Sequence, residues 1–247
     1  MKEDKLSIII VAHNEEKFLP KLLRSLSRQS FKSFEIIIVD SHSSDRTKEY
    51  AMKYKHAFPE FSYLLLDDTP GPATGRNKGA ALANYPRLLF LDSDTILPPD
   101  FLEKSLAEID RKHADLASGR ARIAENHPLS RFGIHFLNFF MILLYPRYLS
   151  AYGACLFSTK DIHDRIGGFD ESLGICEDCH YVKKAVKTQG LKYLILKAFF
   201  YTTDRRAKAE GGIPLMLKYI KSHLYRMITG KEIPRNKITY TYELHEK

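Results

Sequence analysis

The chain has 247 residues, of which 44% are hydrophobic and 28% are charged. This composition excludes wholesale disorder, and the length suffices for one large α/β domain with its own core. The formal net charge of +8 favours an anionic partner, which could be a sugar nucleotide, a membrane surface or nucleic acid.

Two local features bear on the cellular compartment. The chain contains only three cysteines, which argues against a disulfide scaffold. Cys176 and Cys179 have the C-x-x-C spacing, but no second C-x-x-C and no H-x-x-x-H follows, so we expect no zinc site there. Residues 1–5 carry no apolar signal segment, and we therefore expect a cytoplasmic protein.

Apolar strands and amphipathic helices alternate from the start of the chain. The predicted strands are 6–11, 34–40, 61–66, one within 87–94, 114–123, 151–157 and 191–196. The predicted helices are one following Asn14 and then 46–55, 75–83, 99–112, 158–166, 179–188 and 213–228, with a charged loop at 202–206. The order β-α-β-α-β at the start predicts a parallel sheet with right-handed crossovers.

The first helix is predicted to begin directly after the first strand. Asn14 is placed to cap this helix, with Glu15 and Glu16 in its first turn, where the helix dipole favours carboxylates.

Two aspartates stand at the end of the strand that begins at Arg87. Because alternate residues of a strand point the same way, Asp92 and Asp94 can both face one side just beyond the carboxyl edge of the sheet. Open α/β sheets bind their ligands at that edge. The two charges repel each other, and a divalent cation that carries a diphosphate would relieve the repulsion. A solvated turn or a helix cap is the alternative interpretation.

Two apolar segments lie in the second half of the chain. Residues 132–145 are almost wholly apolar but fall short of the roughly 20 residues that a membrane span requires. The helix predicted at 213–228 is amphipathic and carries Lys218, Lys221 and Arg226. Such a helix can lie among anionic headgroups, which predicts a peripheral protein on the inner face of the membrane. Packing of both segments on the sheet, or on each other in a homodimer, is the alternative.

Several motifs stand in one order along the chain. They are Val11 to Glu15, Val39 to Asp45, Gly75 to Gly79, Asp92-Ser93-Asp94, Gly167 to Glu171, and Glu177-Asp178. Together they resemble the family-2 glycosyltransferases, inverting enzymes with the GT-A fold, over about residues 5–210. The resemblance implies an α/β fold with a Rossmann-like, mostly parallel central sheet flanked by helices. We divide the chain into a glycosyltransferase domain, 1–210, with a nucleotide-binding half, 1–95, and an acceptor half, 96–210, and a C-terminal amphipathic helical extension, 211–247.

The resemblance also implies roles for single residues. The residues that would bind the nucleotide sugar are Ala12, His13, Glu15, Asp40, Arg76, Asp92, Ser93, Arg205 and Arg206. Within that set, Asp40 would hold the base, Asp92 the ribose, and the two consecutive arginines the diphosphate. Asp94, with Asp92, would bind Mg²⁺ or Mn²⁺, and Asp178 matches the usual catalytic base, with Glu177 beside it.

Each of these residues also has a purely structural interpretation. Asp40 and Asp178 could only cap helices, Arg76 could be a surface charge, and Arg205 and Arg206 could belong to a solvated turn. The chain also departs from the family pattern. Ala12 and His13 stand where Pro and Tyr are usual, and Ser-His-Ser-Ser-Asp follows Asp40 instead of Asp-Gly-Ser-x-Asp. These changes leave the choice between a UDP-sugar and a GDP-sugar open.

The expected reaction is metal-dependent transfer of a sugar, with inversion, from a nucleoside-diphosphate sugar to an acceptor. The acceptor could be a polyprenyl phosphate, another lipid-linked molecule or a soluble compound. A sugar-nucleotide nucleotidyltransferase is the alternative enzyme, but that class usually has a glycine-rich loop after the first strand, and Ala12 to Glu15 contain no glycine. We do not expect nucleic acid to bind, since the basic residues do not interleave with exposed aromatic residues.

Overall fold

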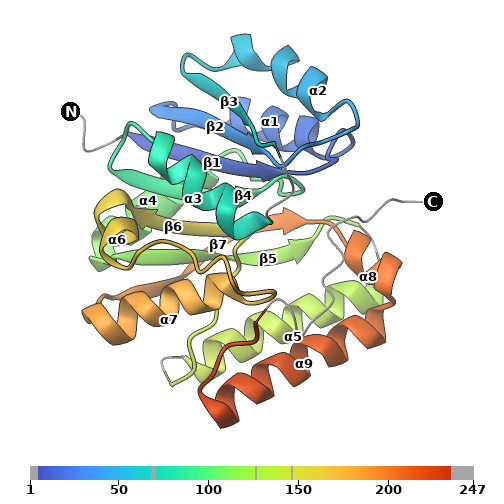
Figure 1. Cartoon of the computed structure of the whole chain (residues 1–247), viewed down its shortest axis with the longest axis vertical. Coiled ribbons are helices and arrows are strands. Elements are labelled where there is room, and N and C mark those ends of the chain that lie inside the picture. Colours follow the sequence, from blue (N-terminus) through green and yellow to red (C-terminus); the bar gives the residue numbers. More distant parts are fainter. Residues whose placement is uncertain (1–4, 68–70, 126, 146, 235–247) are drawn as a thin grey trace.

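The computed structural model describes residues 5–67, 71–125, 127–145 and 147–234, in which helices flank both faces of a seven-stranded sheet (Figure 1). The strands are β1 (Leu6–Ala12), β2 (Phe34–Asp40), β3 (Phe61–Leu65), β4 (Arg87–Asp92), β5 (Leu116–Ile123), β6 (Cys155–Thr159) and β7 (Tyr193–Thr202). The helices are α1 (Leu19–Ser27), α2 (Thr47–Lys53), α3 (Pro72–Leu82), α4 (Phe101–Lys112), α5 (Pro128–Leu144), α6 (Lys160–Arg165), α7 (Glu177–Gln189), α8 (Arg205–Glu210) and α9 (Gly212–Thr229), with a 3₁₀ turn at Lys55–Ala57.

The sheet is mostly parallel, in the order β3-β2-β1-β4-β6-β5-β7. Strands β1 to β4 pair in parallel, which confirms the sheet predicted from the β-α-β-α-β order. Strand β6 runs antiparallel to both β4 and β5, whereas β7 pairs in parallel with β5. The sheet therefore contains one reversed strand, β6, which lies between β4 and β5.

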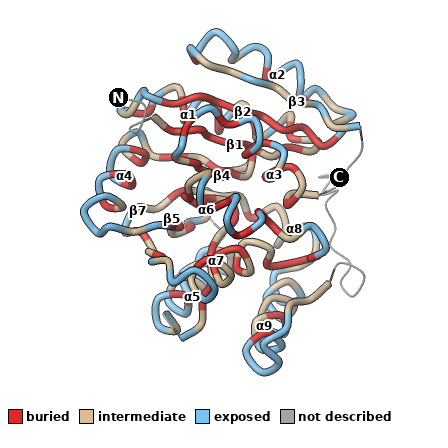
Figure 2. Tube along the Cα trace, turned by 60° about the vertical axis from the view of Figure 1, so that its left-hand side comes forward, coloured by how far each residue is buried: buried red, intermediate tan, exposed pale blue. Residues whose placement is uncertain are grey.

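Side chains on the two faces of the sheet form two separate apolar clusters. On one face, Ile8 of β1 belongs to the cluster that contains Leu22 of α1 and Leu102 of α4. On the other face, Ile9 belongs to the cluster that contains Ala80 of α3 and Val182 of α7. Because both faces are covered, the central strands are buried along their whole length (Figure 2), which explains their continuous apolar sequences.

The carboxyl ends of three strands meet at one edge of the sheet. In the register of the parallel pairs, Ala12 lies opposite Asp40, and Val11 lies opposite Asp92. Leu91 pairs with Cys155 of the antiparallel strand β6, which brings the turn preceding β6 to the same edge. The loops that follow β1, β2 and β4 are thus gathered around one place.

The predicted cap of the first helix is wrong. Helix α1 begins at Leu19, after Phe18, and Asn14 instead adopts a left-handed conformation with φ of 55°. Its Oδ1 accepts a hydrogen bond from the backbone N–H of Ser44 at 2.8 Å. The polar groups of Asn14 therefore tie the β1 loop to the β2 loop, and Glu15 lies in a turn before the helix.

Several predicted boundaries also differ, and α3 begins at Pro72, three residues before its predicted start at Gly75. Strand β6 begins at Cys155 and not at Ala151, because a turn precedes it, in which the N–H of Cys155 donates to the carbonyl of Tyr152 at 3.0 Å. Strand β7 continues to Thr202, since the exposed Lys197 interrupts its apolar pattern without ending its pairing with β5. Arg205 opens the short helix α8, where we expected a loop.

The remaining predicted elements are present, including the amphipathic helix, which is α9. Two predictions fall on residues that the structure does not describe. They are the absence of a signal segment at the start, 1–4, and the end of the C-terminal extension, 235–247. In the described part of the chain, none of the helices combines the length and the hydrophobicity needed to cross a bilayer. The domain boundaries stay a prediction.

We expect Gly79→Ala to destabilise the fold. A Cβ atom at this position of α3 would overlap the side chain of Ile9 and approach Val39 Cγ2 to 3.2 Å, so α3 would have to move away from the sheet. The cost of such overpacking is about 1–3 kcal/mol, more than the roughly 1 kcal/mol that alanine gains over glycine in a helix. Urea unfolding followed by circular dichroism measures the difference.

Gly133→Ala in α5 is the matched control. No atom lies within 4 Å of a Cβ built at Gly133, so only the helix propensity changes, and stability should rise slightly or stay the same. Equal effects of the two substitutions would contradict a close contact between α3 and β1.

Candidate functional site

Arg76 of α3 is a deeply buried charge at the carboxyl edge of the sheet, with a side chain that is 2% exposed. Its Nη2 bonds Asp92 Oδ1 at 2.7 Å, and its Nη1 bonds Glu177 Oε1 at 2.8 Å. Burial alone would lower the pKa of Arg76, but the two carboxylates outweigh it and raise the pKa above the ordinary arginine value. The interpretation of Arg76 as a surface charge is therefore wrong.

Asp178 lies beside this ion pair, in the first turn of α7. Its Oδ2 accepts the backbone N–H of Gly153 at 2.6 Å, and its Oδ1 accepts that of Cys179 at 2.7 Å. Burial raises the pKa of the Asp178 carboxyl well above its ordinary value, and the charge of Glu177 acts in the same direction. The side chain of Cys176, and not that of Asp178, stands at the cap position of α7. The carboxyl group thus favours the protonated form more than a surface aspartate does.

Gly153 allows these groups to come close together. A Cβ atom there would lie 2.9 Å from Arg76 Nη2 and 3.2 Å from Asp178 Oδ2. Any side chain at this position would push the arginine and the aspartate apart.

A second ion cluster joins the β1 loop, the β4 loop and α8. Arg205 donates to both oxygens of Glu15, at 3.0 and 2.6 Å, and its Nε lies 3.3 Å from Asp94 Oδ2. The hydroxyl of Thr203 donates to the same Asp94 oxygen at 2.9 Å. Burial raises the pKa of Glu15 to about 7, although the charge of Arg205 opposes this shift. The interpretation of Arg205 as part of a solvated turn is wrong, because its side chain is only 19% exposed.

Asp40 closes the same edge on the β2 side. Its Oδ1 accepts the backbone N–H and the hydroxyl of Ser43 at 2.9 and 2.6 Å, and its Oδ2 accepts the hydroxyl of Tyr63. Burial, followed by this hydrogen bond, raises the pKa of Tyr63 above its ordinary value. His13 Nδ1 donates to the carbonyl of Ser41 at 2.7 Å. Asp40 therefore fixes its own loop and does not cap α2.

The structure brings most of the predicted site residues together, with one clear exception. Ala12 and Ser93 are buried at the strand ends beside Asp40 and Glu15. Arg206, by contrast, turns to α9, where its Nη1 donates to the hydroxyl of Tyr219 at 3.0 Å. Arg205 and Arg206 are neighbours in sequence but belong to different sets of contacts.

Three contributing groups were not found from the sequence. Tyr63 is bonded to Asp40, Thr203 is bonded to Asp94, and the N–H of Gly153 holds Asp178. Thr203 stands two residues before Arg205, and this adjacency was a usable signal. Tyr63 and Gly153 had none, because their partners are distant in the chain.

A divalent cation at Asp94 would have to take most of its ligands from elsewhere, because Arg205 already contacts both Asp94 and Glu15. Asp94 and Glu15 offer hard carboxylate oxygens close enough for the charge of Asp94 to raise the pKa of Glu15. Among the described residues, no three His, Cys, Asp or Glu side chains form a group able to hold a metal. Mg²⁺ and related ions are often bound by one or two carboxylates together with water and substrate phosphates. Cys176 and Cys179 are free, buried thiols.

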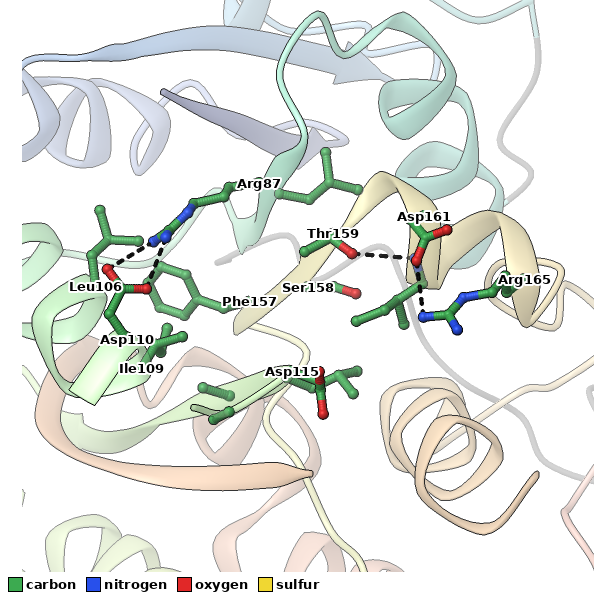
Figure 3. A pocket seen from close by; sticks show the side chains of 15 residues that line it. Arg87, Leu106, Ile109, Asp110, Asp115, Phe157, Ser158, Thr159, Asp161 and Arg165 are labelled. Carbon is green, nitrogen blue, oxygen red and sulfur yellow. Dashed lines mark hydrogen bonds and ion pairs between the residues drawn. The ribbon is translucent and has the colours of Figure 1, made fainter. Parts of the chain in front are cut away.

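A pocket at the opposite end of β4 does not belong to this site (Figure 3). Four of its charged side chains pair with each other, Arg87 with Asp110 at 2.8 Å and Arg165 with Asp161 at 2.8 Å, and Asp115 accepts the backbone N–H of Lys192 at 2.8 Å. Strand β4 begins at Arg87 and ends at Asp92, so the length of the strand separates the pocket from the carboxyl edge.

Comparison with known proteins identifies the family of this chain. Residues 7–161 match the family described as Glycosyl transferase family 2. The chain belongs to glycosyltransferase family 2.

Two relatives of this family-2 protein are longer than it is. The poly(ribitol-phosphate) beta-N-acetylglucosaminyltransferase TarS of Staphylococcus aureus is 29% identical over 215 residues, which cover 83% of this chain and 36% of TarS. The glycosyltransferase AglE of Haloferax volcanii is 27% identical over 185 residues, which cover 73% of this chain and 60% of AglE. The chain thus spans less than two thirds of the length of either relative.

Solved structures confirm the predicted GT-A fold. A crystal structure of TarS 1–349 in complex with UDP-GlcNAc has a TM-score of 0.64 and 26% identity, and the match covers 81% of this chain and 58% of that one. The mannosyltransferase PcManGT from Pyrobaculum calidifontis, in complex with GDP-Man and Mn²⁺, has a TM-score of 0.70 and 17% identity, and covers 88% of this chain and 64% of that one. The likeness to PcManGT is one of fold.

We expect Arg76→Ala to destabilise this family-2 domain by about 1–3 kcal/mol, because it leaves the partly buried carboxylates of Asp92 and Glu177 without their shared counter-ion. The free energy of unfolding in urea measures this loss. Arg87→Ala is the control, since Arg87 also bonds an aspartate at 2.8 Å but both partners are partly exposed, and such a pair contributes less than about 1 kcal/mol. Similar losses for both variants would contradict a structural role for the buried pair.

Proposed function

We propose that this chain catalyses the inverting transfer of a sugar from a nucleoside-diphosphate sugar to an acceptor. The observation that carries the proposal is the position of Asp178, whose carboxyl group is held by the N–H of Gly153 beside the strand ends that carry Asp92 and Asp94. A UDP-sugar or a GDP-sugar is the expected donor, and the UDP-GlcNAc in the TarS structure supports the first.

The nucleotide part of the donor would bind where β1, β2 and β4 end. Asp40 would bind the base, with His13 and Ala12 lining the pocket, and Asp92 would bind the ribose. These three strand ends are adjacent in the sheet, which supports a single pocket for the nucleoside. Arg76 keeps Asp92 in place and would act on the nucleotide through this carboxylate.

The reaction is a single in-line displacement. The acceptor oxygen forms a bond to the anomeric carbon while the bond from that carbon to the diphosphate oxygen breaks, and the nucleoside diphosphate leaves with the electron pair. Asp178 takes the proton of the acceptor hydroxyl, and a raised pKa makes its carboxylate a better general base. Arg205 would offer its guanidinium to the departing diphosphate. Mg²⁺ or Mn²⁺ held by Asp94, when bound, would neutralise further phosphate charge.

The acceptor is proposed to be lipid-linked, such as a polyprenyl phosphate. The support is the large apolar surface that α5 and α9 present next to the acceptor half of the site, as described below. A soluble acceptor is the alternative.

We expect Asp178→Asn to lower turnover by about 10²–10⁴-fold on a hydroxyl acceptor, since that is the usual contribution of a general base. The affinity for nucleotide should stay unchanged. The assay is the release of nucleoside diphosphate from UDP-GlcNAc or GDP-mannose, with water or an offered alcohol as the acceptor. Because its pKa is raised, the base loses its proton at higher pH, and the acidic limb of the wild-type profile should lie above the ordinary aspartate value of about 4.

Asp161→Asn, on the exposed surface of α6, serves as the control for this measurement and should leave turnover unchanged. Near-wild-type turnover of the Asp178 variant on a confirmed hydroxyl acceptor would contradict the base role. An anionic phosphate acceptor needs no proton removed, so there the expected loss is small.

We expect Asp94→Ala to abolish the metal-dependent part of nucleotide binding, while Asp92→Ala weakens it less. Replacing an outer-shell partner of a metal typically costs about 10–100-fold in affinity, so loss of a direct ligand should cost at least that much. Calorimetry with UDP and GDP, each with Mn²⁺ and then with a chelator, measures the effect. An Asp94 variant whose affinity still rises with Mn²⁺ as in the wild type would refute the assignment.

A further inference from the structure

The large apolar side chains exposed in the described part of the chain are concentrated on two helices. On α5 they are Phe132, Phe136, Phe139, Phe140, Ile142 and Leu143, and on α9 they are Ile213, Met216, Leu217, Leu224, Tyr225, Met227 and Ile228. The two helices are in contact and lie side by side, beyond the end of the sheet that β5 and β7 form (Figure 1). We call these residues the α5/α9 face. Exposed apolar side chains gathered on two adjoining helices point to a binding site for a partner.

Helix α9 turns much of its apolar side away from the protein. Its buried side chains are Ser222 and Arg226, whereas Ile228 is 81% exposed. Arg226 bonds Glu232 at 2.6 Å and the hydroxyl of Tyr148 at 2.8 Å, so polar contacts fix the inward side. These contacts decide which side of the amphipathic helix faces the protein, and the apolar side faces outward.

The exposed charges of these two helices have one sign. Helices α5 and α9 contain no aspartate or glutamate, and their basic residues are Arg131, His135, Lys218, Lys221, His223 and Arg226. Lys218 and Arg226 are paired with Glu210 and Glu232, which lie outside the two helices. Arg131 and Lys221 are exposed, and the exposed Arg147 and Lys231 follow the ends of the two helices. The apolar face is therefore bordered by cations, which is the pattern of helices that lie among anionic headgroups.

We propose that the α5/α9 face binds the surface of a membrane that contains anionic lipid, with both helices lying in the plane of the headgroups. The apolar side chains enter the acyl boundary, and the flanking lysine and arginine residues contact phosphate groups. A second copy of the chain fits this face less well. A two-fold interface places the same patch against itself, so the basic residues of both copies would meet without a carboxylate from either helix pair.

The surface is joined to the active site through α9. Tyr219 of α9 accepts a hydrogen bond from Arg206, the neighbour of Arg205, at 3.0 Å. After α9 the chain turns back, and the carbonyl of Ile233 accepts the N–H of Gly174 at 3.4 Å, three residues before Glu177. The inward side of α9 and the chain that follows it thus contact the segments that carry Arg205 and Asp178, while the α5/α9 face points away from them. A lipid-linked acceptor would then reach the site from the membrane, a consequence that rests on the proposed function.

Flotation of the full chain on a density gradient tests the surface without any substrate. The wild type should rise with vesicles of phosphatidylcholine and phosphatidylglycerol at low ionic strength, rise less with phosphatidylcholine alone, and be released by salt. Leu217→Glu and Phe139→Glu should each lower the membrane-bound fraction by about tenfold or more, since each replaces an inserted apolar side chain with a charge.

Leu82→Glu is the matched control, because Leu82 and Leu217 are both 46% exposed, but Leu82 lies on α3 and away from this face. Its binding should equal that of the wild type, and circular dichroism should show that all variants are folded. Failure of the wild type to float at low salt would overturn the proposal, as would equal loss for Leu82→Glu and Leu217→Glu. A dimer in light scattering that Leu217→Glu dissociates would assign the face to a second copy and overturn it as well.

The flotation experiment and the sugar-transfer assay can fail independently, so their outcomes distinguish the two proposals. Wild-type flotation without any donor turnover would leave the membrane surface standing and refute the proposed function. Turnover with a soluble acceptor, in a chain that does not float, would refute the surface alone.

Discussion

The buried ion pair of Arg76 with Asp92 and Glu177 is the constraint on which the site depends. Taking a guanidinium out of water costs several kcal/mol, and only well-placed carboxylates offset this. Asp92 ends β4, and Glu177 begins α7. The arginine therefore joins two segments that are 85 residues apart in the chain. Because Asp178 directly follows Glu177, the same contact sets where the carboxyl group proposed as the base lies relative to the donor strands.

At the rest of the carboxyl edge, three carboxylates are held by a small number of hydrogen-bond donors. Glu15 and Asp94 share the guanidinium of Arg205, while Asp40 relies on the hydroxyls of Ser43 and Tyr63. A diphosphate brought to this edge adds negative charge, and Arg205 would then be attracted to the phosphates as well as to the carboxylates. A Glu15 pKa of about 7 eases this competition, since the carboxyl group can take up a proton at little cost near neutral pH.

The sequence predicted the elements whose pattern is local and uninterrupted. Strands β1, β2 and β4 are largely apolar, and the carboxylates that end β2 and β4 marked the edge of the sheet correctly. Prediction failed where a distant partner decides the local structure. Asn14 has the residue type of a helix cap, but its side chain bonds Ser44 instead, and the hydrogen bond from Tyr63 to Asp40 cannot be read from a strand pattern. The same reason explains β7, whose pairing with β5 continues past Lys197.

The side that helix α9 turns toward solvent could not be predicted from the sequence either. Its periodicity indicates an amphipathic helix, yet periodicity does not state which side faces the protein, and most such helices bury their apolar side. Here the buried network of Arg226, Glu232 and Tyr148 determines the orientation, since turning α9 over would expose these bonds and leave Glu232 without its closest partner. The polar network therefore holds the apolar side outward. Because Tyr219 of α9 also accepts a hydrogen bond from Arg206, the orientation that turns the apolar side outward is the one that turns Tyr219 toward the start of α8.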